Sequence, residues 1–291
     1  MILPAPEACR ERRVWHGRVN ITENVAINAD TYRVRIRCPE IARAIVPGQF
    51  LMFRLPRCED PLLGRPLAFY EVVADAAGVP EQIDIVYVAM GRMTKRLAAL
   101  RAGATLEVWG PLGNGFPVLT AEHVLLVAGG IGQTPFLSLA RECLGHAVFG
   151  DPPRQVIPAK QVTLCYGARS KEHLAGADDF RHHGVTVLVS TDDGSTGHHG
   201  LVTDLIDQAV QDSSLTCQIV CCGPEPMMKA TAAVAQRLGV PCLVSLETPM
   251  ACGIGACFSC VAKIRDASGQ WDYRRTCVEG PVFDAASVEF D

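Results

Sequence analysis

The sequence lacks the features that would assign it to a membrane, secreted or nucleic-acid-binding class. No segment approaches the roughly 20 apolar residues of a membrane span, and the first twenty residues contain no continuous apolar run of the kind found in signal peptides. The formal net charge of the 291 residues is -4, so no overall basic surface favours nucleic acid or an anionic membrane. Since 48% of the residues are hydrophobic, we expect two or three globular parts and a cytoplasmic location.

Motifs of hydrolytic catalysis and of the usual dinucleotide site are also absent. We find no nucleophile elbow, no Ser/His/Asp arrangement and no hydrolase pair of carboxylates, and the eight histidines form no compact ligand set. The G-x-G-x-x-G fingerprint of Rossmann proteins is not met. The sequence by itself therefore identifies no catalytic residue.

Cysteine, in contrast, is plentiful, with 13 residues. In a reducing compartment clustered cysteines are first interpreted as metal ligands or redox groups. Cys252, Cys257, Cys260 and Cys277 give the spacing C-x4-C-x2-C-x16-C, which is the plant-type ferredoxin pattern for a [2Fe-2S] cluster. Structural zinc sites usually use two knuckles of two cysteines each, so zinc is the weaker alternative and four unligated thiols the weakest.

The first 110 residues predict an antiparallel barrel. Short runs of alternating or continuous apolar character predict six strands, at RRVWHGRV, TYRVRIRC, QFLMFRL, PLAFYEVV, QIDIVYVAM and TLEVWG. One helix is predicted over residues 94–103, with Gly103 as its stop. Six short strands and one helix favour an antiparallel six-stranded barrel.

After the turn-rich segment 110–117, strands and helices alternate, which predicts a parallel α/β sheet with helices on both faces. Between a buried strand and a helix lie Gly129, Gly130 and Gly132, where a bare backbone can receive a pyrophosphate. A tight structural turn explains this G-G-x-G pattern equally well. Cys222, Gly223 and Pro224 follow another strand, where open parallel sheets bind their ligands, although Cys222 is also explained as a small buried residue.

We divide the chain into three predicted domains. Residues 10–116 form the barrel, residues 117–241 the α/β domain, and residues 242–291, which lose the strand and helix alternation and contain the cysteines, a small third module.

The order of these motifs resembles a known family. A barrel with R-P-x-x, then G-G-I-G-x-x-P, then C-G-P and the cysteine loop, is similar to the electron transfer subunits of class 1B dihydroorotate dehydrogenase, in the ferredoxin–NADP reductase superfamily. The resemblance covers nearly the whole chain. Its most specific segments are MACGIGAC, TDDGSTG, YGARSKEHL, GPLGNGF and CVEGPVFD.

The resemblance implies FAD on the barrel, NAD on the parallel sheet and a [2Fe-2S] cluster on the tail. The implied FAD residues are Arg65, Pro66, Leu67, Ala68, Val86, Tyr87, Val88, Met93 and Thr94. Three of them depart from the family: Ala68 lacks a hydroxyl, Val88 replaces a basic residue, and Met93 replaces a glycine that lets phosphate approach. The implied NAD residues are Gly129, Gly130, Gly132, Cys222, Gly223 and Pro224, and the implied cluster ligands are Cys252, Cys257, Cys260 and Cys277.

The implied function is electron transfer between NAD and an FMN-containing, dihydroorotate-oxidising partner in pyrimidine biosynthesis, within a heterotetramer. Two alternatives stay open: a FAD and [2Fe-2S] reductase subunit of a hydrogenase, sulfur reductase or transhydrogenase, and a zinc-stabilised nucleotide-binding protein without a redox role. Arg169 and Lys171 follow a strand where the 2′-phosphate of NADP could be bound, so the choice between NAD and NADP also stays open.

Overall fold

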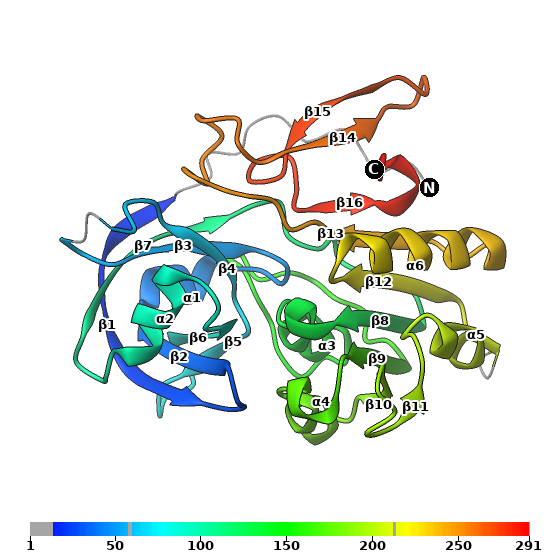
Figure 1. Cartoon of the computed structure of the whole chain (residues 1–291), viewed down its shortest axis with the longest axis horizontal. Coiled ribbons are helices and arrows are strands. Elements are labelled where there is room, and N and C mark those ends of the chain that lie inside the picture. Colours follow the sequence, from blue (N-terminus) through cyan, green and yellow to red (C-terminus); the bar gives the residue numbers. More distant parts are fainter. Residues whose placement is uncertain (1–13, 58–59, 212–213, 291) are drawn as a thin grey trace.

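The computed structural model describes residues 14–57, 60–211 and 214–290. Within these residues the strands form two sheets of seven strands and one of two strands. Figure 1 shows the first sheet curled into a barrel, the second sheet beside it with its helices, and the cysteine-rich tail above both. In the described part of the chain no helix is long and apolar enough to cross a membrane. Residues 10–13, at the start of the predicted first domain, lie outside the described residues.

The first sheet is antiparallel, in the order β4-β3-β7-β1-β2-β6-β5. Apolar side chains at alternate positions, such as Val34 and Ile36 in β2, are fully buried and fill the barrel. Its strands are β1 (Trp15–Ala26), β2 (Thr31–Arg37), β3 (Phe50–Arg54), β4 (Arg65–Ala68), β5 (Glu71–Ala74), β6 (Pro80–Val88) and β7 (Thr105–Leu112).

The barrel has seven strands and not the predicted six, because the segment predicted as one strand is divided into β4 and β5. The chain changes its pairing partner at this point: the Phe69 N–H donates to the Gln49 carbonyl at 3.4 Å, whereas the Tyr70 N–H donates to the Asp84 carbonyl at 2.8 Å. Since β4 pairs with β3 and β5 with β6, this segment links the two ends of the sheet and closes the barrel.

The helices of the barrel differ from the prediction in two ways. The predicted helix over 94–103 is α2 (Arg92–Ala99), which begins two residues earlier and ends at Ala99. A second helix, α1 (Pro39–Ala44), was not predicted, because its six residues are too few to show helical periodicity.

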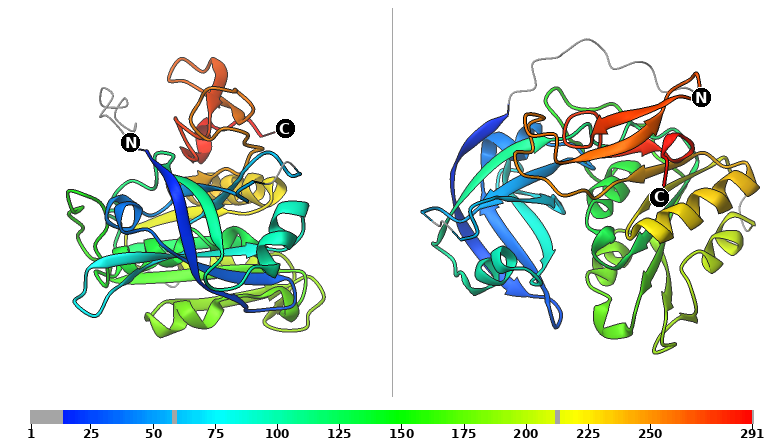
Figure 2. Two further views of the ribbon diagram at one scale, coloured as in Figure 1. Left: turned by 90° about the vertical axis from the view of Figure 1, so that its left-hand side faces the viewer. Right: turned by 45° about the horizontal axis from the view of Figure 1, so that its top comes forward.

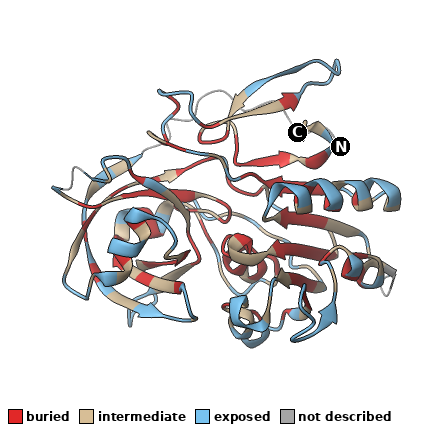
Figure 3. Cartoon of the chain, in the orientation of Figure 1, coloured by how far each residue is buried: buried red, intermediate tan, exposed pale blue. Residues whose placement is uncertain are grey.

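The second sheet has the order β11-β10-β9-β8-β12-β13-β16 and is parallel except for β16, which confirms the predicted α/β architecture. Along β8, Val124 and Leu126 contact one core and Leu125 and Val127 the other, so both faces are buried (Figure 3). Its strands are β8 (His123–Gly129), β9 (Gln161–Ala168), β10 (Thr186–Thr191), β11 (His198–His199), β12 (Cys217–Cys222), β13 (Cys242–Ser245) and β16 (Val282–Asp284).

Helices cover both faces of this sheet. Residues of α3 (Phe136–Cys143) and α4 (Ala177–His182) belong to one core, and residues of α5 (Asp204–Gln211) and α6 (Glu225–Leu238) to the other. The glycine turn after β8 forms a short 3-10 helix, η1 (Gly130–Gln133), so α3 begins at Phe136 with Pro135 as its N-cap residue. Two further short 3-10 helices are η2 (Lys171–His173) and η3 (Ala285–Ser287).

The cysteine-rich tail is bound to both other parts of the molecule. Its hairpin of β14 (Val261–Arg265) and β15 (Trp271–Arg275) is a separate two-stranded sheet, whereas β16 pairs antiparallel with β13 at the edge of the second sheet. The right-hand view in Figure 2 shows this tail lying across the barrel and the α/β part. The second sheet therefore extends past the boundary predicted at 241/242, and the three-domain division stays a prediction.

Candidate cofactor and cluster site

The four candidate cluster ligands lie where the tail meets the barrel. Cys260 and Cys277 are buried and their sulfur atoms are 3.2 Å apart. They pack in one apolar cluster with Phe50, Met52, Leu112 and Met250. Cys252 is half-buried and Cys257 is exposed. The cysteine loop, residues 250–260, is thus seated on the outer face of β3 and β7.

Gly253 is required where this loop meets the barrel. It has a φ of +73°, which side chains rarely adopt, and a Cβ there would lie 2.7 Å from Met52 Cγ and 2.9 Å from Leu112 Cδ1. The absence of a side chain therefore lets the loop backbone approach the barrel.

Hydrogen bonds fix the loop at both ends. Trp109 of β7 donates from Nε1 to the Cys252 carbonyl at 2.8 Å. The Cys260 carbonyl accepts from the Thr276 N–H at 2.8 Å and from the Thr276 hydroxyl at 3.1 Å, which places Cys277, in the turn after β15, beside Cys260. The 16 residues between these two cysteines therefore form the β14–β15 hairpin, which returns Cys277 to the loop.

The four candidate ligands lie as two pairs of sulfur atoms. Among the described residues, no three histidine, cysteine, aspartate or glutamate side chains are gathered closely enough to hold one metal ion. The sulfur atoms instead form pairs, Cys260 with Cys277 at 3.2 Å and Cys257 with Cys252 through a hydrogen bond. Two thiolates at each of two irons is the ligation that a [2Fe-2S] centre held by four cysteines needs.

The loop also stabilises negative charge on sulfur. Hydrogen bonds from Ser259, followed by those from Cys252, lower the pKa of Cys257 to about 6. The Gly255 N–H donates to Cys277, and this bond acts against the burial that raises the pKa of that thiol. Thiolate is the form that ligates metal, so these donors suit a ligand role.

Arg275 holds the exposed side of the loop. Its guanidinium lies over the Phe258 ring, 5.1 Å from the ring centre, and Nη1 donates to the Gly255 carbonyl at 3.2 Å. Phe258 has a φ of +57°, an unfavourable conformation for a side chain with a Cβ. Arg275 therefore helps to hold the positive-φ conformation of Phe258, which changes the direction of the chain between Cys257 and Cys260.

The structure brings the two predicted NAD segments together at the carboxyl edge of the second sheet. A Cβ at Gly132 would lie 2.3 Å from the Cys222 carbonyl oxygen, and one at Gly129 would lie 2.8 Å from Pro224 Cδ. Gly223 has a φ of +156° and approaches the Gly129 backbone. These glycines permit backbone contact between the two turns, whereas Gly130, with a φ of +54°, faces open space.

Cys222 ends β12 and is half-buried between these turns. Burial raises the pKa of Cys222, the nearby charges of Cys221 and Glu247 raise it further, and a hydrogen bond with Ser245 lowers it. The thiol is therefore neutral at physiological pH. Its contact with a nicotinamide ring stays a prediction.

The predicted FAD segment at residues 65–68 is β4, at the edge of the barrel sheet. Arg65 is exposed, and among the described residues its Nη1 donates to the backbone carbonyls of Gly64 at 2.9 Å and Leu63 at 3.3 Å. The guanidinium is thus available to a phosphate. Pro66, Leu67 and Ala68 are half-buried and pair with β3, where Ala68 lies opposite Phe50.

The remaining predicted FAD residues have mixed environments. Tyr87 is buried in the barrel core and donates to Asn24 at 3.2 Å, Val86 packs against the α/β part, and Val88 is half-buried. Met93 is also buried in the barrel core, so its bulk is directed away from the surface. The Thr94 hydroxyl accepts from the Gly91 N–H at 3.1 Å and serves as a helix cap.

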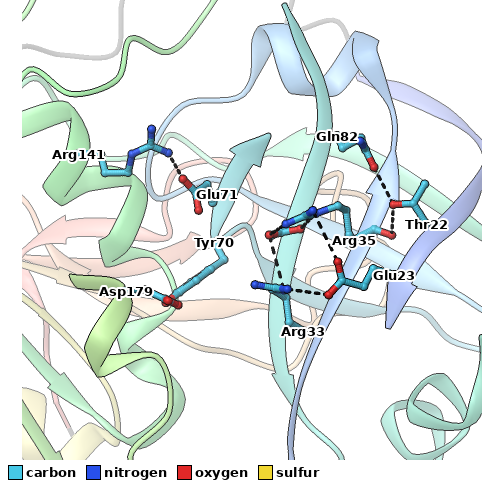
Figure 4. Close-up of polar contacts among 10 residues, drawn as sticks. Thr22, Glu23, Arg33, Arg35, Tyr70, Glu71, Gln82, Arg141 and Asp179 are labelled. Carbon is cyan, nitrogen blue, oxygen red and sulfur yellow. Dashed lines mark hydrogen bonds and ion pairs between the residues drawn. The ribbon is translucent and has the colours of Figure 1, made fainter. Parts of the chain in front are cut away.

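Sequence reasoning missed the polar contacts that join the barrel to the α/β part (Figure 4). The Tyr70 hydroxyl donates to Asp179 at 2.7 Å, and Glu71 pairs with Arg141. Burial, and then the charge of Asp179, raises the pKa of Tyr70. No motif signals these residues, because the contact depends on how two domains pack.

Two cavities adjoin the contact between the barrel and the α/β part. One, of about 460 Å³, is lined by residues that include Ile27, Arg33, Val86, Leu174, Asp179 and Thr196. The other, of about 350 Å³, contains Arg33, Tyr70, Asp179, His182 and His183 among its lining residues. Arg33 and Asp179 face both cavities. The larger cavity falls within the size range of ligand pockets.

Three family models match consecutive parts of the chain. The oxidoreductase FAD-binding domain matches residues 18–116, and the oxidoreductase NAD-binding domain matches residues 126–233. The iron-sulfur cluster binding domain of dihydroorotate dehydrogenase B matches residues 247–289. The predicted cofactors, FAD, NAD and an iron–sulfur cluster, are thereby confirmed at the level of domains, and the individual contact residues stay predictions.

Several proteins are similar over nearly the full length. The dihydroorotate dehydrogenase B (NAD(+)), electron transfer subunit, of Shouchella clausii is 37% identical over 280 residues, which cover 95% of this chain and 99% of the relative. The proteins of the same name from Desulforamulus reducens and Fusobacterium nucleatum are 35% and 34% identical and cover 96% and 93% of this chain, and 99% and 97% of their own lengths.

Solved structures share the fold. A chain from the structure of an NADH-dependent reduced ferredoxin-NADP oxidoreductase superposes with a TM-score of 0.77 at 30% identity, over 94% of this chain and 90% of that one. A ferredoxin reductase of carbazole 1,9a-dioxygenase superposes with a TM-score of 0.64 at 21% identity, over 78% of this chain and 67% of that one, and shows the fold alone.

Proposed function

The chain belongs to the family of dihydroorotate dehydrogenase B electron transfer subunits, and on that premise we propose that it passes electrons between NAD and a dihydroorotate-oxidising partner subunit in pyrimidine biosynthesis. The partner would hold FMN, and the complete assembly would be a heterotetramer with two copies of each subunit. Dihydroorotate chemistry belongs to the partner in this proposal.

The observation that carries the proposal is the seating of the cysteine loop on the flavin domain. Gly64, which precedes the predicted flavin strand β4, lies against the ring of Trp109, and the same indole donates to the Cys252 carbonyl. One side chain thus contacts the segment before Arg65 and the loop of a cluster ligand. This proximity is what electron exchange between two bound centres requires.

The residues of this chain position the cofactors. FAD, when bound, exchanges a hydride with NAD and single electrons with an iron–sulfur centre. Arg65 would neutralise its phosphates, and the backbone of β4 and β6 would lie along it. The close turns at Gly129–Gly132 and Cys222–Pro224 would receive the pyridine nucleotide, and the four cysteines would ligate the cluster.

The test is anaerobic purification followed by cofactor analysis. We expect FAD, about two iron and two sulfide per chain, NADH oxidation with an artificial acceptor, and no dihydroorotate oxidation until an FMN-containing partner is added. Protein with neither iron nor flavin, or dihydroorotate oxidation by this chain alone, would contradict the proposal. A zinc-containing, colourless protein would support the nucleotide-binding alternative.

A second candidate is the flavin and iron–sulfur subunit of a transhydrogenase. The specific observation in its favour is the 30% identity and TM-score of 0.77 with a chain of the reduced ferredoxin-NADP oxidoreductase. Reconstitution separates the two candidates: the first predicts NAD reduction by dihydroorotate with the FMN subunit, and the second predicts NADH-dependent exchange with ferredoxin and NADP.

A further inference from the structure

Ser259 lies between the candidate ligands Cys257 and Cys260 in the sequence, and it also contacts Ala251 near the start of the cysteine loop. Its hydroxyl oxygen is 3.1 Å from Cys257 Sγ and 3.1 Å from the Ala251 backbone nitrogen. Neither the family pattern C-x4-C-x2-C nor the four cysteines themselves specify a serine at this position.

The Ala251 contact and the thiolate form of a ligating Cys257 together determine the direction of the hydroxyl proton. A backbone N–H can only donate, so Ala251 occupies a lone pair of the Ser259 oxygen. At the 3.1 Å contact with Cys257 Sγ either group can donate while the cysteine is a thiol, but the thiolate sulfur that ligates a metal has no proton. The Ser259 O–H is therefore the donor and Cys257 Sγ the acceptor.

The backbone is arranged to make this bond. Phe258 adopts a φ of +57°, which reverses the chain between Cys257 and Ser259. This conformation is disfavoured for phenylalanine, and the Arg275 guanidinium over its ring helps to hold it. A strained residue beside a ligand indicates that the local geometry is selected for the site.

We propose that Ser259 is a positioning residue that raises the reduction potential of the cluster by donating its hydroxyl proton to Cys257 Sγ, an inference that rests on the proposed function. Reduction adds negative charge that is shared with the ligand sulfurs. A hydrogen bond to sulfur stabilises the reduced state more than the oxidised one and so raises the potential. The bond also orients the Cys257 side chain toward the rest of the loop.

The experiment is a redox titration of the purified, cluster-loaded chain, followed by electron paramagnetic resonance. Ser259→Ala removes the donor, and we expect a lower midpoint potential, equivalent to an approximately tenfold shift of the flavin–cluster electron equilibrium toward the flavin, or about 59 mV for a one-electron couple. Ser259→Thr keeps the hydroxyl at an exposed position and should leave the potential unchanged.

Ser268→Ala is the matched control, because Ser268 is an exposed serine whose hydroxyl bonds to Asp266 in the hairpin turn, away from the cysteines. If Ser259→Ala does not assemble a cluster, Ser259→Gly also lacks the donor and should show the same downward shift. An unchanged or higher midpoint in a cluster-loaded Ser259→Ala or Ser259→Gly chain would overturn the inference. Wild-type protein without iron would instead overturn the proposed function, so the two failures are distinguishable.

Discussion

Trp109 Nε1 donates a hydrogen bond of 2.8 Å to the carbonyl oxygen of Cys252, and this bond joins a barrel strand to the cysteine loop across 143 positions of sequence. Trp109 also packs in the apolar cluster that contains Cys260 and Cys277. The indole therefore anchors the loop by a directed bond and by apolar contact.

Trp109→Phe tests this anchor, because it keeps an aromatic ring and removes the donor. We expect the cluster-loaded protein to lose about 1 kcal/mol of stability, the usual net value of such a hydrogen bond, and to release iron faster on exposure to oxygen. Iron content over time and thermal unfolding measure the effect. Trp271→Phe, at an exposed hairpin position, is the control and should retain iron at the wild-type rate.

Gly253→Ala tests the close approach of the loop to the barrel. The added Cβ would meet Met52 Cγ at 2.7 Å, so the loop must move outward, and we expect a chain that binds FAD but holds little iron. Gly269→Ala is a matched control, since Gly269 has a similar φ of +82° but no atom of the described residues within 4 Å of a Cβ. Iron content in Gly253→Ala equal to that in Gly269→Ala would contradict this prediction.

Gly132→Ala tests the contact between the two turns at the nucleotide edge. A Cβ placed 2.3 Å from the Cys222 carbonyl oxygen must separate them, and we expect NADH to reduce the flavin roughly 10- to 100-fold more slowly. Dithionite should still reduce flavin and cluster normally. Gly184→Ala, where a Cβ would meet no described atom within 4 Å, should not affect the reduction of the flavin by NADH.

His123 predicts a dependence of stability on pH. It is fully buried, its Nε2 is 3.0 Å from the Thr163 hydroxyl, and burial lowers its pKa. Since the folded pKa lies below the unfolded value of about 6.5, its contribution to stability is present above that pH and is lost as the pH falls.

The measurement is the free energy of unfolding between pH 7.5 and 5.5. We expect His123→Asn to reduce the slope with pH by up to about 1.4 kcal/mol per pH unit, whatever its effect at pH 7.5. His199→Asn, at an exposed position, should keep the wild-type slope. Identical slopes for wild type and His123→Asn would contradict this prediction.

Tyr70→Phe tests the seam between the barrel and the α/β part. Asp179 would lose its donor at 2.7 Å, and hydrogen bonds to charged groups contribute about 1.5–3 kcal/mol, so the free energy of unfolding should fall by an amount near the lower end because Asp179 is partly exposed. Chemical denaturation measures this change. Tyr273→Phe, in the exposed hairpin, should be neutral.

Much of the fold could be predicted because its signals are local. The unbroken apolar run of β8 is buried on both faces, and the spacing of Cys252, Cys257, Cys260 and Cys277 favoured a [2Fe-2S] cluster. The split between β4 and β5 could not be predicted, since Phe69 and Tyr70 change partners only when the barrel closes.

Three residues of the candidate site could not be predicted from the sequence, for a different reason. Trp109, Tyr70 and Arg275 act through partners that are 143, 109 and 20 positions away, at Cys252, Asp179 and Gly255. Such contacts depend on tertiary packing and leave no periodic pattern. For Met93, the residue type alone suggested that its bulk would hinder the approach of a phosphate. Its position on α2 instead directs the side chain into the barrel core.

β16, the last strand of the described residues, pairs with β13 and forms one edge of the second sheet, which belongs to the nucleotide-binding part. A chain truncated before the cysteines would lack β16. β13 would then be an exposed edge strand with unpaired backbone N–H and C=O groups, which favours aggregation. A flavin reductase made by deleting the tail is therefore expected to aggregate more readily than the full chain. The pairing ties the cysteine-rich tail to the nucleotide-binding sheet through backbone hydrogen bonds.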